Sequence, residues 1–143
     1  METARMKTVI GLITALLMAA GLGAVTAPAA TAAACDSYSG CVDTSTTASA
    51  PRVVAKRRKA TVCGTVAAVA SNATPRGQLR ITVTRNRGKF RFAKTVPYNG
   101  GKMCAVTKKL RKTGGYTVLV AFLPQQGSIF NPSSGSAGFD VGR

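Results

Sequence analysis

Strict alternation of apolar and polar residues is the feature that most limits what this chain can fold into. Across residues 78–85, Leu79, Ile81 and Val83 alternate with arginine and threonine side chains. Because successive side chains on a β-strand point to opposite faces, this run predicts a strand with one buried and one exposed face. An amphipathic helix would repeat its apolar residues every three to four positions, and no such run follows residue 34.

Similar short runs recur along the chain and are separated by turn-forming residues. The predicted strands cover residues 61–69, 78–85, 90–92, 103–110 and 116–122, with a last short strand at Phe139 and Val141. Glycine, proline and asparagine between the runs favour turns, and residues 124–136 predict a long Gly/Ser/Pro loop. Six or seven short strands without helices predict an all-β fold, a small antiparallel β-sandwich.

The N-terminal segment has the three parts of a signal peptide. Arg5 and Lys7 supply a positive start, residues 9–25 are uncharged and apolar or small, and residues 32–34 are all alanine. Signal peptidase requires small residues before the cut, so cleavage after this alanine triplet is predicted. Two alternatives stay open. One is a retained membrane anchor, since the apolar run approaches the roughly 20 residues of a span, and the other is lipidation of Cys35.

The chain therefore divides into three predicted parts. These are a signal peptide over residues 1–34, a cysteine-containing loop and linker over 35–51, and a β-sandwich domain over 52–143. The linker itself, residues 42–51, consists mainly of serine, threonine and alanine and ends at Pro51. Such a composition lacks the large apolar side chains that bury a core, so a flexible spacer is expected.

All four cysteines, Cys35, Cys41, Cys63 and Cys104, lie in the predicted mature chain. An even number of cysteines in an exported chain argues for two disulfides. Of the possible pairings, Cys35–Cys41 and Cys63–Cys104 are favoured, because the first closes a short loop and the second joins two predicted strands. The second would close a loop of about 40 residues and stabilise the fold by roughly 3–4 kcal/mol.

Few residues of the mature chain can carry enzyme chemistry. It has no histidine and no glutamate, and its carboxylates are Asp36, Asp43 and Asp140, which are far apart in the sequence. Catalysis at neutral pH usually needs a histidine, a pair of carboxylates, an activated nucleophile or a metal. The cysteine spacing matches no zinc pattern, and no phosphate-binding glycine loop is present. A protein without enzymatic activity, metal or cofactor is therefore predicted.

The second half of the sandwich domain resembles the immunoglobulin-like repeats of exported bacterial surface proteins. The residues that carry the resemblance are Leu110-x-x-x-Gly114-Gly115-Tyr116-x-Val118-x-Val120-x-Phe122-x-Pro124, then Phe130-x-x-Ser133, then Phe139-x-Val141. The resemblance implies an immunoglobulin-like sandwich over residues 52–143 and a role as a stalk or adhesive unit. Such repeats are often acidic or uncharged and arranged in tandem, whereas this chain has one basic copy. Tyr116 is expected to bond a nearby backbone group, as a tyrosine corner does.

Positive charge is the other marked property of the mature chain. Removal of residues 1–34 takes away two of the 20 basic residues and one of the four acidic residues, which leaves a formal charge of +15. The basic residues form three clusters: Lys56, Arg57, Arg58 and Lys59; Arg80, Arg85, Arg87, Lys89 and Arg91; and Lys108, Lys109, Arg111 and Lys112. Solubility needs a charge of only about 2–8 in a small domain. Binding of a polyanion is therefore predicted, and the alternative is a solvated basic surface.

The positions of these clusters indicate how the charges are arranged and which classes of partner are not expected. Alternation along residues 78–92 places Arg80 and Arg91 on the polar face of a hairpin, which predicts a positive stripe. Phe90 and Phe92 are expected to point into the core, and no nucleic-acid motif is present, so a specific nucleic-acid partner is not expected. No run of the mature chain predicts a transmembrane span.

The function predicted from the sequence is that of a secreted, extracellular module of the cell envelope. It would act as a structural or adhesive unit and contact anionic polymers, such as teichoic acids or acidic polysaccharides, through its basic surface. The alternative is a diffusible cationic effector or inhibitor that binds a protein partner or a foreign membrane. Retention on the envelope that salt reverses would favour the first function, and release into the medium would favour the second.

Overall fold

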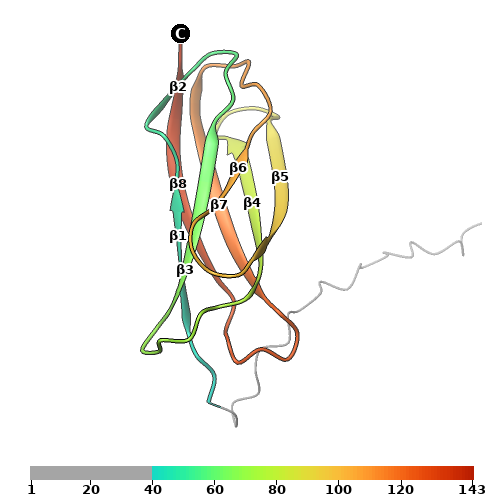
Figure 1. The fold of residues 1–143 in the computed structure, drawn as a ribbon. Helices are drawn as coiled ribbons and strands as arrows, with labels where there is room; N and C mark the ends of the chain where they lie inside the picture. The colour runs from blue at the N-terminus through green and yellow to red at the C-terminus, as the bar shows by residue number, and fades with distance from the viewer. Residues whose placement is uncertain (1–39) are drawn as a thin grey trace, which may run out of the picture. The chain divides into compact units, whose positions relative to one another are not determined.

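A computed structural model describes residues 40–143, and these residues form strands and loops without a helix. The strands are β1 (Thr44–Ser49), β2 (Val53–Ala55), β3 (Thr61–Ala68), β4 (Gly77–Arg85), β5 (Arg91–Tyr98), β6 (Met103–Val106), β7 (Gly114–Pro124) and β8 (Ser133–Gly142). They form two sheets that face each other (Figure 1). The predicted all-β sandwich is confirmed, with eight strands where six or seven were expected. The predicted signal peptide and its cleavage site lie outside the described residues.

One sheet has three strands in the order β1-β3-β6, and the other has five in the order β2-β8-β7-β4-β5. Neighbouring strands are antiparallel except for β2 and β8, which are parallel. The connections β3–β4, β5–β6 and β6–β7 each pass from one sheet to the other. Loops at the two ends of the sandwich therefore bring together segments that are distant in the sequence.

The core lies between the sheets and is built by the alternating runs. Leu79, Ile81 and Val83 on β4 have no exposed surface, as predicted. In the β4–β7 ladder, Leu79 pairs with Phe122 and Ile81 with Val120, and these partners are equally buried. Burial of one such side chain stabilises a fold by about 1.5–3 kcal/mol. These two central strands therefore supply a large part of the apolar core.

The prediction of a flexible linker over residues 42–51 is wrong, because most of this segment forms β1. This strand pairs with β3 along its whole length. Thr46 is buried, and its hydroxyl shares a 2.6 Å hydrogen bond with the hydroxyl of Ser133 on β8. The hydroxyl of Thr44 donates to the carbonyl of Asn131 at 2.7 Å. Threonine is branched at Cβ and favours extended backbone, so a Ser/Thr segment forms a strand once its hydroxyls find partners.

The loop predicted over residues 124–136 is shorter than expected. Strand β7 continues through Pro124, and β8 begins at Ser133 and runs for ten residues. The first half of β8 consists of small residues that have little β propensity of their own. Its pairing with β7 supplies the backbone hydrogen bonds that hold it extended. Local sequence therefore underestimates this strand, because its stability comes from its neighbours.

Two other strand boundaries also differ from the predictions. The strand predicted over residues 103–110 ends at Val106, because the following residues pair with the β2–β3 loop. The short strand predicted at residues 90–92 becomes β5, which extends through Pro97 to Tyr98. Proline is tolerated there because β5 is an edge strand of its sheet.

The predicted disulfide between Cys63 and Cys104 is confirmed. The two residues pair directly across β3 and β6, within the three-stranded sheet. Ala105 is buried and Cys104 is exposed, so Ala105 is the residue that β6 turns toward the core. The bond links residues 41 positions apart and ties the four-residue strand β6 to the sheet. Cys41 is also disulfide-bonded, and its predicted partner Cys35 lies outside the described residues.

Two buried tyrosines bond backbone groups near the strand ends. The hydroxyl of Tyr116 on β7 donates to the carbonyl of Lys112 at 2.8 Å, as the sequence predicted. The hydroxyl of Tyr98 on β5 accepts a 2.9 Å hydrogen bond from the amide of Val66, on the opposite sheet. It also lies 2.9 Å from the carbonyl of Gly101. Tyr98 therefore links the two sheets, a role that no pattern in the sequence indicated.

Candidate anion-binding site

Three loops that carry basic residues meet at one end of the sandwich. They are the β2–β3 loop (residues 56–60), the β4–β5 loop (residues 86–90) and the β6–β7 loop (residues 107–113). The strand directions bring them to the same end, because β4 finishes where β7 starts, with Arg85 paired with Tyr116. This end lies at the top of Figure 1, where the C terminus is marked. We call it the basic end.

The β2–β3 and β6–β7 loops are held together by hydrogen bonds. The buried hydroxyl of Thr107 accepts a bond from the amide of Ala60 at 2.9 Å, and the amide of Thr107 donates to the carbonyl of Ala60. Leu110 is fully buried; its amide donates to the carbonyl of Arg58, and its carbonyl accepts from the amide of Arg57. The backbone that carries two basic clusters is therefore fixed, while the charged side chains remain exposed.

Arg85, the last residue of β4, connects this strand to the β6–β7 loop. Its guanidinium donates a 2.8 Å hydrogen bond to the carbonyl of Thr113. Its Nε atom is buried and has no hydrogen-bond partner among the described residues. A side chain added at Gly88 would lie 2.9 Å from this guanidinium, so the glycine leaves room for it. The sequence predicted Arg85 as a ligand contact, and in the structure its guanidinium also bonds the β6–β7 loop from the end of β4.

Basic side chains surround a hollow between the β2–β3 and β6–β7 loops. This hollow has a volume of about 650 Å³, and we call it the basic hollow. Its lining residues are Lys56, Arg57, Lys109, Arg111 and Lys112. All five residues are exposed, and no acidic residue lines the hollow. Charges of one sign gathered around a concave surface raise the local concentration of anions.

The other basic residues predicted as ligand contacts divide between this end and the sheet. Arg58, Lys59, Arg87, Lys89 and Lys108 lie in the three loops, and Arg91 begins β5 beside them.

Arg80 lies apart from the basic end. It is exposed in the middle of β4, next to Thr95 and Ala121. Four residues of strand, about 13 Å at 3.3 Å per residue, separate it from Thr84, the partner of Arg91. Arg80 and Arg91 are both exposed on the polar face of the hairpin, as predicted, but Arg80 stands apart from the charges of the basic end.

The aromatic residues near this end do not form an exposed platform. Phe90 is half-buried, and its ring meets that of Tyr116 edge-on, with centroids 5.4 Å apart. Phe92 is half-buried and pairs with the buried Val83. Stacking of bases on exposed aromatic rings is a main way of binding single-stranded nucleic acid, and these two rings pack against the protein instead.

Within residues 40–143, no three potential metal-ligating side chains lie together. The same part of the chain contains no helix long and apolar enough to cross a membrane. No protein-family model matches the chain, and no curated protein is significantly similar to it. The basic end itself is therefore the feature from which a function can be inferred.

Proposed function

We propose that this protein is an exported, non-enzymatic, immunoglobulin-like module of the cell envelope that binds anionic polymers through its basic end. The observation that carries the proposal is the meeting of three basic loops, two of which are fixed to each other by backbone hydrogen bonds. A fixed array of charges binds a polymer with less loss of conformational freedom than a flexible basic tail would.

The strand arrangement supports the immunoglobulin-like part of the proposal. Variable-type immunoglobulin domains place extra strands beside the central strands of one sheet, as β5 lies beside β4. They also have a tyrosine near the start of a late strand that bonds backbone a few residues upstream. Tyr116 on β7 makes that bond with Lys112. The disulfides support export, because such bonds persist in oxidising compartments.

The chemistry of the basic end favours repeated phosphate or carboxylate groups over a single small anion. The basic hollow is lined by both lysine and arginine. Arginine can bond an oxyanion with two parallel N–H groups, and lysine acts as a point charge. Because each such interaction is exposed and therefore weak, useful affinity requires many of them along one polymer chain.

The test is binding of the purified, oxidised protein to isolated cell envelopes over a salt titration. We expect binding at low salt that falls steeply as salt rises, because each neutralised anionic group releases counterions. Replacement of Lys109, Arg111 and Lys112 by glutamine should weaken binding. It should also reduce the slope of log K against log salt by about 2–3, since each basic side chain that neutralises an anionic group contributes roughly 0.7–0.9 to that slope.

A matched variant separates a site from net charge. Arg76, Lys94 and Lys102 are exposed and lie outside the basic end. Their replacement by glutamine removes the same charge, and we expect it to reduce binding much less. Equal reductions in the two triple variants would show that charge alone, and no particular end of the molecule, determines binding. No binding at low salt would instead favour a diffusible protein with a discrete partner.

A further inference from the structure

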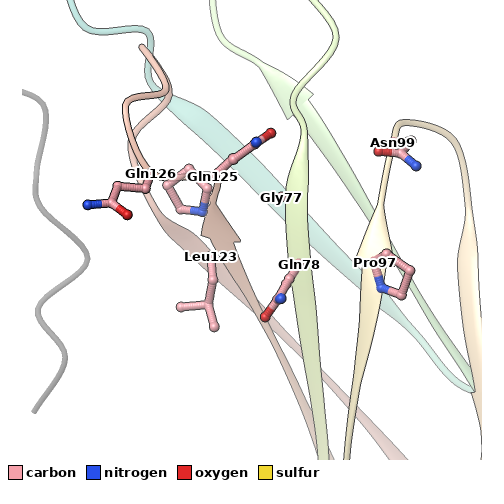
Figure 2. A pocket seen from close by; sticks show the side chains of 8 residues that line it. Gly77, Gln78, Pro97, Asn99, Leu123, Gln125 and Gln126 are labelled. Atoms are coloured by element: carbon pink, nitrogen blue, oxygen red, sulfur yellow. The ribbon is translucent and has the colours of Figure 1, made fainter.

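A second hollow lies at the end of the sandwich opposite the basic end. It is formed where β5, β4 and β7 reach that end, and it encloses about 460 Å³. Its lining residues are Gly77, Gln78, Pro97, Asn99, Leu123, Pro124, Gln125 and Gln126 (Figure 2). We call it the amide hollow. Along β4 it lies about 26 Å from the basic end, at about 3.3 Å per residue.

The lining of the amide hollow is uncharged and rich in carboxamides. The chain has only three glutamines, Gln78, Gln125 and Gln126, and all three line this hollow. Asn99 adds a fourth carboxamide. Among residues 40–143, no hydrogen bond engages these four side chains. Each side-chain amide offers two N–H donors and one carbonyl acceptor, so the hollow presents both kinds of group to a ligand.

Apolar side chains share the hollow with the amides. Gln78 pairs with Pro97 on one side and with Leu123 on the other, so the three side chains form a row across β5, β4 and β7. Figure 2 shows Leu123 and Gln78 on neighbouring strands, with Gln125 and Gln126 beyond the end of β7. Leu123 is 37% exposed. The hollow therefore combines an apolar strip with polar groups around it.

The backbone around these side chains is fixed. The amide of Gln125 donates to the carbonyl of Arg76, and its carbonyl accepts from the amide of Ser128. The second bond closes a turn in which Gly127 has a φ of +75°, as the third position of a type II turn requires. A Cβ atom at Gly77 would lie 2.2 Å from the carbonyl oxygen of Leu123. The turn holds both glutamines at the rim, and Gly77 allows the strands to approach.

A neighbouring hollow extends the surface past the same two glutamines. It encloses about 350 Å³, and its lining includes Arg76, Gln125, Gln126, Ser128 and Ile129. Ile129 is 48% exposed. Typical small-molecule sites have volumes of about 300–1,000 Å³. Two hollows that share a pair of amides can therefore hold successive units of one chain-like ligand.

We infer that the amide hollow and its neighbour bind a neutral carbohydrate chain. Sugar hydroxyls donate and accept hydrogen bonds, and carboxamides match both functions without a charge. The C–H face of a sugar ring is apolar and can pack on Leu123, Pro97 and Pro124. An anionic ligand would be drawn more strongly to the basic end, because the amide hollow has no charged lining residue and its neighbour has only Arg76. A proline-rich peptide would require exposed aromatic side chains, which this hollow lacks.

The test is a ¹⁵N NMR titration of the purified protein with three neutral oligosaccharides: chitotetraose, mannotetraose and maltotetraose. We expect at least one of them to shift the side-chain amide signals of Gln78, Asn99, Gln125 and Gln126 in a saturable way. Replacement of Gln125 and Gln126 by alanine should raise the dissociation constant at least about tenfold, since two hydrogen-bonding side chains are removed. Both residues are exposed, so the variant should fold normally, which its unfolding temperature checks.

The control variant is Asn72→Ala, which removes an exposed amide from the nearby β3–β4 loop outside both linings. We expect its affinity to equal that of the wild type. The inference is overturned if no oligosaccharide shifts the four signals, or if the glutamine double variant binds as well as the wild type. These outcomes do not bear on the basic end, which a parallel titration with inorganic polyphosphate reports separately.

Discussion

Tyr98 supplies hydrogen bonds that β3 lacks because β6 is shorter than β3. Strand β6 pairs with β3 only as far as Gly64, so the amide and carbonyl of Val66 point to a position where β6 has ended. The hydroxyl of Tyr98 accepts from that amide at 2.9 Å and lies 3.1 Å from that carbonyl. A buried backbone group without a partner costs about 1–3 kcal/mol. One side chain therefore takes the place of a missing strand partner.

This role leads to a prediction about Tyr98→Phe. The change keeps the ring but leaves the amide of Val66 without its partner, so we expect the free energy of unfolding to fall by about 1–3 kcal/mol. Tyr116→Phe is the control, because it removes only the bond to the carbonyl of Lys112. It should cost about 0.5–1.5 kcal/mol. Chemical denaturation of both variants measures the difference, and an equal decrease would argue against the link between the sheets.

At the scale of whole elements, the close packing of β1 against β8 depends on a residue without a side chain. A Cβ atom at Gly135 would lie 2.1 Å from the carbonyl oxygen of Thr46 on β1. The backbones of the two sheets therefore approach closely here, and the hydroxyls of Thr46 and Ser133 can meet. This contact closes one side of the sandwich.

We predict that Gly135→Ala destabilises the protein by about 1–3 kcal/mol, the usual cost of overpacking. The control is Gly138→Ala on the same strand, where an added Cβ atom would have its nearest neighbour at 3.7 Å. This change should be close to neutral, because 3.7 Å is an ordinary contact distance. The midpoint of urea unfolding compares the two variants. Equal midpoints would mean that β1 moves away from β8 at little cost.

The same contact explains which strands could be predicted from the sequence. Strands β4 and β7 were expected because large apolar residues alternate in them, and β3 because it is rich in valine and threonine; both signals are local. Strand β1 and the first half of β8 consist of serine, threonine, alanine and glycine. Their extended form depends on pairing with other strands and on hydroxyl bonds between residues 87 positions apart. Interactions over such a separation leave no periodic signal in the sequence.

At the scale of the whole molecule, the basic residues of the candidate site were predicted, but their arrangement was not. Charge clusters are visible in a sequence, whereas the meeting of their loops follows from strand order. Arg80 shows the limit, because alternation predicted its face correctly but could not show that it lies away from the basic end. The amide hollow was missed altogether, since Gln78 and Gln126 are far apart in the sequence. Three glutamines in a sequence do not indicate a site, and only the fold shows that they line the same hollow.

The gathering of like charges at one end should also affect stability. Lys56, Arg57, Lys109, Arg111 and Lys112 line one hollow without an acidic neighbour, so they repel one another in the folded state and less in the extended chain. Salt screens this repulsion, because the Debye length falls from about 10 Å at 0.1 M to about 3 Å at 1 M ionic strength. We therefore predict that added sodium chloride raises the unfolding temperature of the protein while it weakens polyanion binding.

The triple variant Lys109→Gln, Arg111→Gln, Lys112→Gln makes this prediction specific to the basic end. At low salt it should unfold at a higher temperature than the wild type, and its unfolding temperature should depend less on salt. The variant of Arg76, Lys94 and Lys102 has the same net charge, but the charges that it removes lie outside the basic hollow. Its unfolding temperature at low salt should therefore rise less. Differential scanning calorimetry at several salt concentrations measures both effects. If the unfolding temperatures of the two variants rise equally, repulsion is spread over the whole surface. If the variant of Lys109, Arg111 and Lys112 shows the larger rise and also binds the polymer less tightly, the charges that oppose folding are those that bind the polymer.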